Sequence, residues 1–182
     1  DMDPLRRIAE SRNLLLVEDA AEAHGAAYKG RKAGALSAIA AFSFYANKNI
    51  TTGEGGMVVT DDEELWKKAR YYKNLCFPLD APRTYVHANI GFNYRMSNVH
   101  AAIGLAQVEK ADEYVALRRR NALLYRSLLS DVPGVVFQKV PAAAEADYFN
   151  TYWMNALVID PSRYGRSRDE LMKYLDSKGI ET

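Results

Sequence analysis

The chain has 182 residues, 48% of them hydrophobic and 26% charged, which is enough to bury a sizeable core as one domain or as a domain with part of another. Lysine and arginine number 24 against 23 acidic residues, and the formal net charge of +1 gives no indication of nucleic acid or another polyanion as a partner. The single cysteine, Cys76, excludes an internal disulfide or a multi-cysteine metal site, and no apolar run approaches the roughly 18 residues that span a membrane, so we expect a soluble protein of the reducing cytoplasm.

A helix followed by a short strand is predicted at the start of the chain. Asp3 is a suitable cap, and a proline follows it at the first helical position. The apolar residues 14–17 then predict a buried strand, which ends in the acids Glu18 and Asp19. Because ligands bind at the carboxyl ends of strands in open α/β sheets, Asp19 is a candidate site residue, although an aspartate here could also cap a helix that begins at the next residue.

A lysine lies on a loop between the next two predicted strands. Residues 39–44 and 57–59 are apolar runs that predict strands, and the glycine-rich stretch 53–56 predicts a tight turn that returns the second strand beside the first. Lys48 is on the loop between them. A lysine that loses its proton is a nucleophile toward carbonyl groups and forms an imine with an aldehyde, whereas a lysine beside an apolar strand is otherwise usually solvated.

Pyridoxal phosphate is the commonest biological aldehyde that a lysine binds in this way, and two neighbours of Lys48 suit it. The cofactor needs a carboxylate beside its pyridine nitrogen and hydrogen-bond donors for its phosphate. Asp19 is the candidate carboxylate, and the hydroxyl of Ser43 is a candidate donor. Ser43 alternates with Phe42 and Phe44, so its alternative is a plain strand residue that faces the other way.

The middle of the chain predicts a helix, a long connection and a second, longer helix. Residues 61–72 begin with the acids DDEE, which favour a helix amino terminus, and this helix should pack on the sheet. Residues 74–93 have no clear period, and we expect a long excursion that covers the site or a subunit boundary. Apolar residues at helical spacing then predict one long helix over 98–129 with Ser97 as its cap, and the arginine triplet 118–120 would be spread around its solvated surface.

A smaller second lobe is predicted after this helix. Its expected elements are two strands and a helix, at residues 135–140, 152–159 and 168–177. The Ala-rich, acidic stretch 141–150 predicts an exposed loop between the strands. The chain is therefore expected to divide into residues 1–130, part of a large domain that includes the long linking helix, and residues 131–182, the start of a small carboxyl-terminal domain.

Three blocks of sequence contain most of the candidate residues: VEDAAEAHGAAYKGRKAG at 17–34, FSFYANKNITTGEGGMVVTDDEEL at 42–65 and IGFNYRMSNVHAAIGLAQVEK at 90–110. In this order and combination they resemble the DegT/DnrJ/EryC1/StrS family of nucleotide-sugar aminotransferases. The amino-acid sequence of residues 48–57 is most similar to that of the perosamine-synthase branch, which aminates the C4 keto group of a GDP-linked 6-deoxyhexose. Relatives of this kind are longer at both ends, so we expect the chain to be an internal piece of a longer enzyme.

The resemblance implies a fold-type-I pyridoxal phosphate-dependent transferase, with a large α/β lobe built on a mixed sheet and part of a smaller α+β lobe. Its reaction would transfer an amino group from glutamate, through pyridoxamine phosphate, to the keto-sugar of a nucleotide-linked sugar, for surface polysaccharides or amino-sugar natural products. The dehydratase branch carries His where transaminases carry the lysine, so Lys48 favours transamination. Two alternatives remain open: a dehydratase that uses the same cofactor, and a noncatalytic fragment that only dimerises or binds ligand.

Carried over position by position, the resemblance implies roles for five residues. Lys48 would form the imine with the cofactor and then shuttle a proton, and Asp19 would pair with the pyridinium nitrogen. Glu22 would hydrogen-bond the cofactor's phenolic oxygen, a place that relatives often fill with Gln, although it could also be a solvated helix residue. Ser43 would hold the phosphate, and Asn93 would reach the phosphate bound by the neighbouring subunit of a homodimer, unless it caps the helix that follows. The three histidines have no metal-like spacing, so no metal site is expected.

Overall fold

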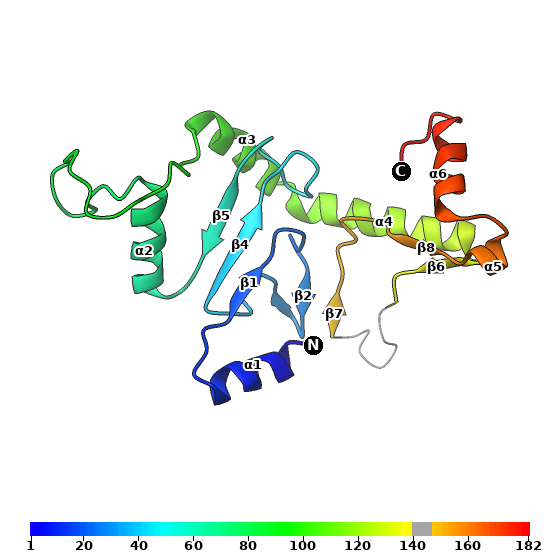
Figure 1. The fold of residues 1–182 in the computed structure, drawn as a ribbon, viewed down its shortest axis with the longest axis horizontal. Helices are drawn as coiled ribbons and strands as arrows, with labels where there is room; N and C mark the ends of the chain where they lie inside the picture. The colour runs from blue at the N-terminus through cyan, green and yellow to red at the C-terminus, as the bar shows by residue number, and fades with distance from the viewer. Residues whose placement is uncertain (140–146) are drawn as a thin grey trace.

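The computed structural model describes residues 1–139 and 147–182, and Figure 1 traces the order of the elements. Within this part of the chain the strands form small sheets with the orders β1-β4-β5, β3-β2-β7 and β6-β8. The first sheet is mixed, because β1 (Val17–Asp19) runs parallel to β4 (Ile39–Ser43) and β5 (Gly56–Val59) returns antiparallel to β4. This mixed sheet confirms the predicted α/β class, and the antiparallel return confirms the tight turn that was predicted after the lysine loop.

The first helix and strand differ in detail from the prediction. Helix α1 (Met2–Ser11) is capped by Asp1, whose carboxylate accepts from the amide of Asp3 at 3.1 Å, so Asp3 is not the cap. The cap two residues earlier still leaves the proline in the first turn, where no backbone donor is needed. β1 is at the edge of its sheet, and the preceding Leu14 and Leu15 are 59% and 60% exposed, so the prediction of a buried strand over 14–17 is wrong for the described chain.

A short hairpin connects the two halves of the chain. β2 (Ala27–Tyr28) pairs antiparallel with β3 (Arg31–Lys32) and, on its other side, with β7 (Tyr148–Phe149). β7 lies in the stretch for which an exposed loop was predicted, so that prediction is wrong there, while residues 140–146 of the same stretch lie outside the described residues. A two-residue strand is defined by its distant partner rather than by local composition, which is why the sequence pattern did not indicate it.

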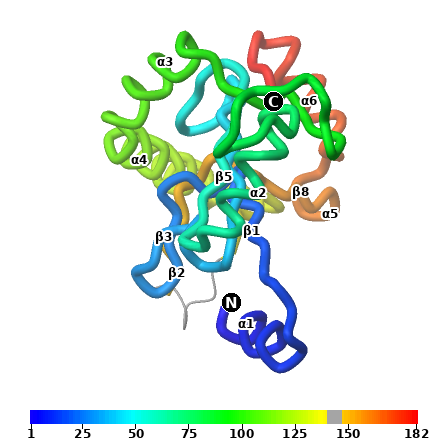
Figure 2. Tube along the Cα trace, turned by 90° about the vertical axis from the view of Figure 1, so that its left-hand side faces the viewer, coloured from blue at the N-terminus to red at the C-terminus, as the bar shows by residue number. Residues whose placement is uncertain are grey.

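The predicted helix after β5 is confirmed, and the long helix is not. α2 (Glu63–Lys73) is capped by Asp62, and the irregular connection after it closes on itself through a bridge between Asn74 and Asn93. The expected helix 98–129 is divided into α3 (Asn98–Val108), with Ser97 as its cap as predicted, and α4 (Ala111–Leu129), which lie on one side of the molecule (Figure 2).

The division between α3 and α4 has a local cause. The amide of Lys110 donates to the carbonyl of Gln107, three residues back instead of four, which tightens the turn and ends α3. The next helix then begins with its own acids in the first turn, Asp112 and Glu113, which stabilise a helix amino terminus. This second group of acids indicates a new helix start, which the continuous apolar periodicity did not predict.

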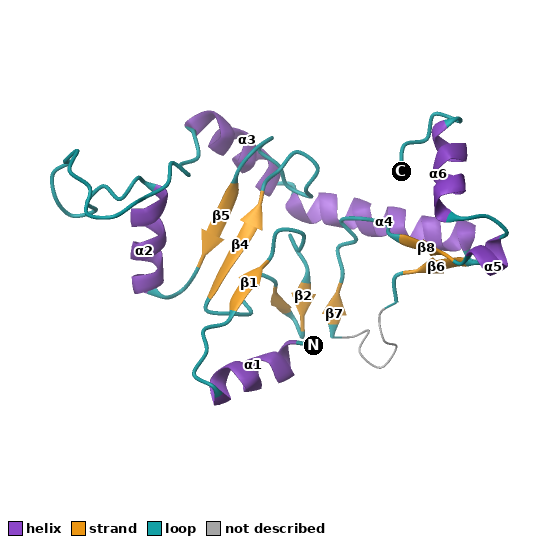
Figure 3. Ribbon diagram, in the orientation of Figure 1, coloured by secondary structure: helices purple, strands orange, loops and turns teal. Residues whose placement is uncertain are grey.

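A small α+β group follows α4 at the other end of the molecule from the mixed sheet (Figure 3). It contains the antiparallel pair β6 (Val135–Phe137) and β8 (Leu157–Ile159), the short helix α5 (Pro161–Tyr164) and α6 (Arg168–Asp176). The strand expected over 152–159 is therefore confirmed only in its last residues, whereas the expected helix is confirmed within one residue. The domain boundary at residue 130 stays a prediction.

The packing of Gly25 on α4 provides a test of the fold. Gly25 has φ +81°, and a Cβ there would lie 2.9 Å from Cγ2 of Val115, whereas at Gly30, with φ +77°, no atom of the described residues lies within 4 Å of the same position. Alanine at either site takes on a left-handed backbone, at about 1–2 kcal/mol, but only Gly25→Ala also overpacks the contact with α4, at ~1–3 kcal/mol more. Urea unfolding should show the larger loss for Gly25→Ala, and equal losses in the two variants would contradict this packing.

Candidate active site

The loop that carries Lys48 is closed at its base by backbone hydrogen bonds. The amide of Phe44 donates to Gly55 O at 2.9 Å, and the amide of Thr52 donates to Phe44 O at 2.9 Å. The hydroxyl of Thr51 also donates to the Phe44 carbonyl, at 3.1 Å. The glycine-rich turn therefore holds residues 45–51 as a compact loop at the carboxyl end of β4, and Lys48 lies in its middle.

The Lys48 side chain is nearly buried between a carboxylate and an aromatic ring. It is 10% exposed, and its Nζ lies 3.7 Å from Oε1 of Glu22, whose own side chain is 65% exposed. On another side, Nζ lies 3.8 Å from the centre of the Trp153 ring. The structure thus brings together two predicted site residues, Lys48 and Glu22, and adds Trp153, which sequence reasoning missed because it comes from a segment far along the chain.

Trp153 is held in place by α4 and by the lysine loop itself. Its indole N–H donates to Asn47 O at 2.8 Å, and Arg118 donates to the Trp153 carbonyl at 3.0 Å. Arg119 donates to the carbonyl of Asn150, and its guanidinium lies 4.2 Å from the Phe149 ring. The prediction that the arginine triplet forms a solvated surface is therefore wrong for two of its three members, because this face of α4 packs on the segment 149–153.

His24 is the second buried group at this site. It is 5% exposed, and its ring packs on two aromatic side chains, with its centre 5.2 Å from that of Phe42 and 5.7 Å from that of Phe44. Burial, and next the charge of Lys48, lower the pKa of His24, so its imidazole is neutral at neutral pH. Within the described residues, His24 Nε2 and Asn49 Oδ1 are buried without hydrogen-bond partners.

The two acids at the end of β1 have different surroundings. The carboxylate of Glu18 accepts from the amides of Gly34 and Leu36, so it fastens the following loop. From the described residues Asp19 accepts only a local bond, from the amide of Ala21 at 3.0 Å, and a turn rather than a helix follows, so the helix-cap alternative is wrong. β1 and β4 are parallel neighbours, so their carboxyl ends lie side by side. Asp19 is therefore at the same end of the sheet from which the lysine loop leaves.

Ser43 is the last residue of β4, and its Oγ accepts from the amide of Tyr45 at 3.3 Å. This position is at the sheet edge where Asp19 also lies, consistent with the predicted role. Among the described contacts, however, neither Asp19 nor Ser43 bonds Lys48 directly. Their roles toward a ligand stay predictions.

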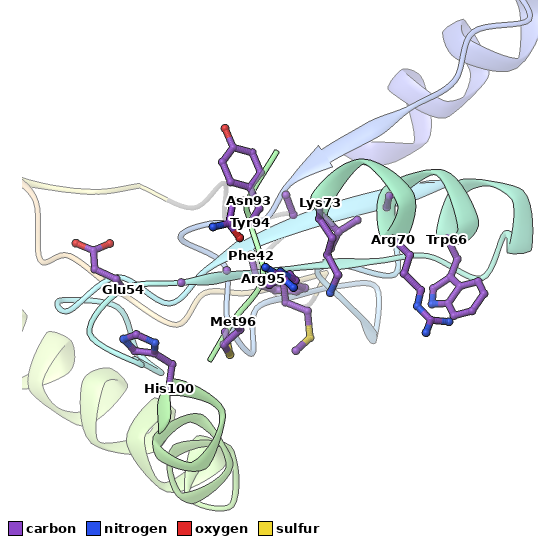
Figure 4. A pocket seen from close by; sticks show the side chains of 16 residues that line it. Phe42, Glu54, Trp66, Arg70, Lys73, Asn93, Tyr94, Arg95, Met96 and His100 are labelled. Atoms are coloured by element: carbon purple, nitrogen blue, oxygen red, sulfur yellow. The ribbon is translucent and has the colours of Figure 1, made fainter. Parts of the chain in front are cut away.

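Asn93 lies in a different place from the other predicted residues. It lines a cavity of about 840 Å³ between the β4-β5 sheet, α2 and the start of α3, whose lining includes none of the other four (Figure 4). Because Ser97 caps α3, the alternative reading of Asn93 as that cap is wrong. The lysine in this cavity, Lys73, is exposed, whereas Lys48 is nearly buried and partnered, so we place the candidate active site at Lys48.

The described residues lack the features of two other kinds of site. They contain no group of three or more His, Cys, Asp or Glu side chains that could hold a metal ion. Among the described helices, none is both long enough and apolar enough to cross a membrane.

Comparison with known proteins adds to this geometry. A family model described as the DegT/DnrJ/EryC1/StrS aminotransferase family matches residues 1–182. The chain is 42% identical over 182 residues to a GDP-perosamine synthase of Escherichia coli O157:H7, and the match covers all of the chain and 47% of that enzyme, so the chain spans about half the length of such curated relatives.

Two solved structures have closely similar folds. One is DesI, determined in the presence of its TDP-sugar product. The match covers 99% of this chain and 44% of the DesI chain, with a TM-score of 0.86 and 35% identity. The other is DesV of S. venezuelae, in complex with a ketimine intermediate. The match covers 100% of this chain and 45% of the DesV chain, with a TM-score of 0.84 and 36% identity. These matches confirm the predicted fold class.

Proposed function

The chain belongs to the DegT/DnrJ/EryC1/StrS aminotransferase family, and we propose that it is part of a pyridoxal phosphate-dependent enzyme that aminates the keto-sugar of a nucleotide-linked sugar. Glutamate would be the amino donor, and the enzyme would work as a homodimer in the cytoplasm. The observation that carries the proposal is a nearly buried Lys48 with a carboxylate and an aromatic ring at its amine. The E. coli relative, a GDP-perosamine synthase, supports a GDP-linked sugar as the substrate class.

The residues around Lys48 fit this cofactor. Lys48 would hold its aldehyde carbon, Asp19 its pyridine nitrogen, Glu22 its phenolic oxygen and Ser43 its phosphate. The buried Nε2 of His24 and Oδ1 of Asn49, which lack partners among the described residues, show that polar groups near the lysine have unused hydrogen-bonding capacity. When bound, pyridoxal phosphate supplies an electron sink for the carbanion at the reacting carbon.

Each of the proposed site residues then has a physical task. Lys48 Nζ moves the proton at the reacting carbon, and the Glu22 carboxylate, 3.7 Å away, helps to orient the amine through their ion pair. Asp19 keeps a proton on the ring nitrogen because a negative charge beside that nitrogen favours the pyridinium form. Trp153 excludes water from the amine, which strengthens the electrostatic interactions there.

The proposed reaction can be tested with isotopes. The full-length enzyme would be incubated with ¹⁵N-glutamate and a GDP-linked 4-keto-6-deoxyhexose, and the products analysed by mass spectrometry. We expect a ¹⁵N-labelled amino sugar together with 2-oxoglutarate. A product that has lost a hydroxyl group and gained no nitrogen would instead support the dehydratase alternative.

Asn93 provides a prediction about the dimer. If each site combines Lys48 of one subunit with Asn93 of the other, equal amounts of inactive Lys48→Ala and Asn93→Ala enzymes, dissociated and reassociated together, should regain about a quarter of wild-type sites, because half of the dimers are mixed and one site in each is intact. Activity after mixing is the measurement. No recovery, with mixed dimers demonstrated by native mass spectrometry, would contradict the shared site.

A further inference from the structure

We infer that Trp153 is the residue that positions Lys48: the face of its ring holds the lysine ammonium, and its N–H holds the loop that carries the lysine. The inference rests on the proposed function only for the task of Lys48. Its structural basis is that Nζ lies 3.8 Å from the ring centre and that the indole N–H donates to Asn47 O at 2.8 Å. One side chain therefore contacts both the reactive group and the backbone next to it.

The backbone around Trp153 is itself constrained. Tyr152 has φ 50°, a left-handed conformation that costs a non-glycine residue roughly 1–3 kcal/mol and persists only where the surroundings impose it. Here the Tyr152 amide donates to Oδ1 of Asn150 at 2.8 Å, and Thr151 is buried. Arg118 bonds the Trp153 carbonyl at 3.0 Å. These contacts fix the direction in which the indole leaves the chain, which is toward the lysine.

This arrangement meets a physical need of Lys48. A lysine whose side chain is 10% exposed has lost most of the water around it, and the single carboxylate 3.7 Å from its Nζ replaces only part of that hydration. The negative face of an indole ring is the most favourable aromatic partner for such a cation. Because the ring comes from the segment after α4, the position of the lysine depends on the packing of that segment as well as on its own loop.

The test measures how readily Lys48 reacts in the cofactor-free, full-length protein. Formaldehyde with cyanoborohydride methylates free lysine amines, and peptide mass spectrometry gives the rate at Lys48 relative to the exposed Lys173 in the same sample. Trp153→Ala should raise the Lys48 rate about tenfold, a factor that corresponds to ~1.4 kcal/mol and lies within the range of cation–π contacts. Trp66→Ala is the matched control, because the other tryptophan contacts Arg70 instead.

Two conservative variants distinguish the effect of the aromatic face from the effect of side-chain volume. Trp153→Phe keeps an aromatic face and should stay within about threefold of wild type, whereas Trp153→Leu fills space without such a face and should behave like Trp153→Ala. With ¹³C-formaldehyde, the methyl resonance of Lys48 should show an upfield ring-current shift in wild type and Trp153→Phe and none in Trp153→Leu.

Two results would overturn the inference: an unchanged Lys48 rate in Trp153→Ala, or equal rates and shifts in the Phe and Leu variants. Both measurements are made without cofactor, so they do not depend on where the cofactor binds. Protection of Lys48 by Trp153 in an enzyme whose cofactor is attached to another lysine would contradict the proposed function and leave this inference standing.

Discussion

Replacing Lys48 with alanine is expected to abolish amino transfer in the full-length enzyme while leaving the fold intact. Covalent attachment of the cofactor and the proton transfer at the reacting carbon depend on the same amine, and proton transfer alone typically contributes about 10²–10⁴-fold. The Lys48 ion pair is with a largely exposed carboxylate, so its loss should change stability little. Steady-state turnover and circular dichroism measure the two effects separately.

Lys67→Ala is the control for removing a lysine. Lys67 pairs with Glu63 and Glu64 on the exposed face of α2, each at 3.0 Å, and contacts none of the proposed site residues. Its variant should retain wild-type turnover. Wild-type transamination by purified Lys48→Ala would contradict the assignment of the nucleophile.

Asp19→Asn is expected to lower the rate of amino transfer about a hundredfold, because the loss of one preorganised electrostatic partner costs on the order of 3 kcal/mol. Asparagine keeps the shape of aspartate, and its side-chain oxygen can still accept the Ala21 amide that Asp19 binds at 3.0 Å. Cofactor should therefore remain bound through Lys48. The loss should appear in single-turnover rates of the cofactor-loaded enzyme.

Glu18→Gln separates the electrostatic effect from a structural one. Glu18 is the neighbouring acid, and it fastens the loop at Gly34 and Leu36 instead of facing the proposed site. This variant should lower stability and keep the rate per bound cofactor. If Asp19→Asn retained near wild-type turnover, the partner of the pyridine nitrogen would have to be another residue.

Much of the candidate site could be predicted because its signals are local. An apolar run that ends in an acid indicated the end of β1, and the glycines after Lys48 indicated the turn that closes its loop on Phe44. The pairing of Lys48 with Glu22 also follows from short-range organisation, since both leave neighbouring parallel strands at the same edge.

The parts that could not be predicted depend on partners far along the chain. The side chain of Trp153 is defined by its contacts with Asn47 and Lys48, and β7 exists only because β2 is beside it. Arg118 looked like a solvated helix residue because periodicity does not show that a later segment covers that face of α4. Leu14 lies before β1 and is exposed, and hydrophobicity alone does not say whether a segment is covered.

Reduction with borohydride followed by peptide mapping is the most direct test of the central claim, that Lys48 holds the cofactor. The full-length enzyme would be loaded with pyridoxal phosphate, reduced so that the cofactor is fixed on the lysine that binds it, digested and analysed by mass spectrometry. The structure predicts the added mass on the peptide that contains Lys48 and on no other lysine. Attachment at another lysine such as Lys73, or an enzyme that turns over with no cofactor attached to any lysine, would contradict the account.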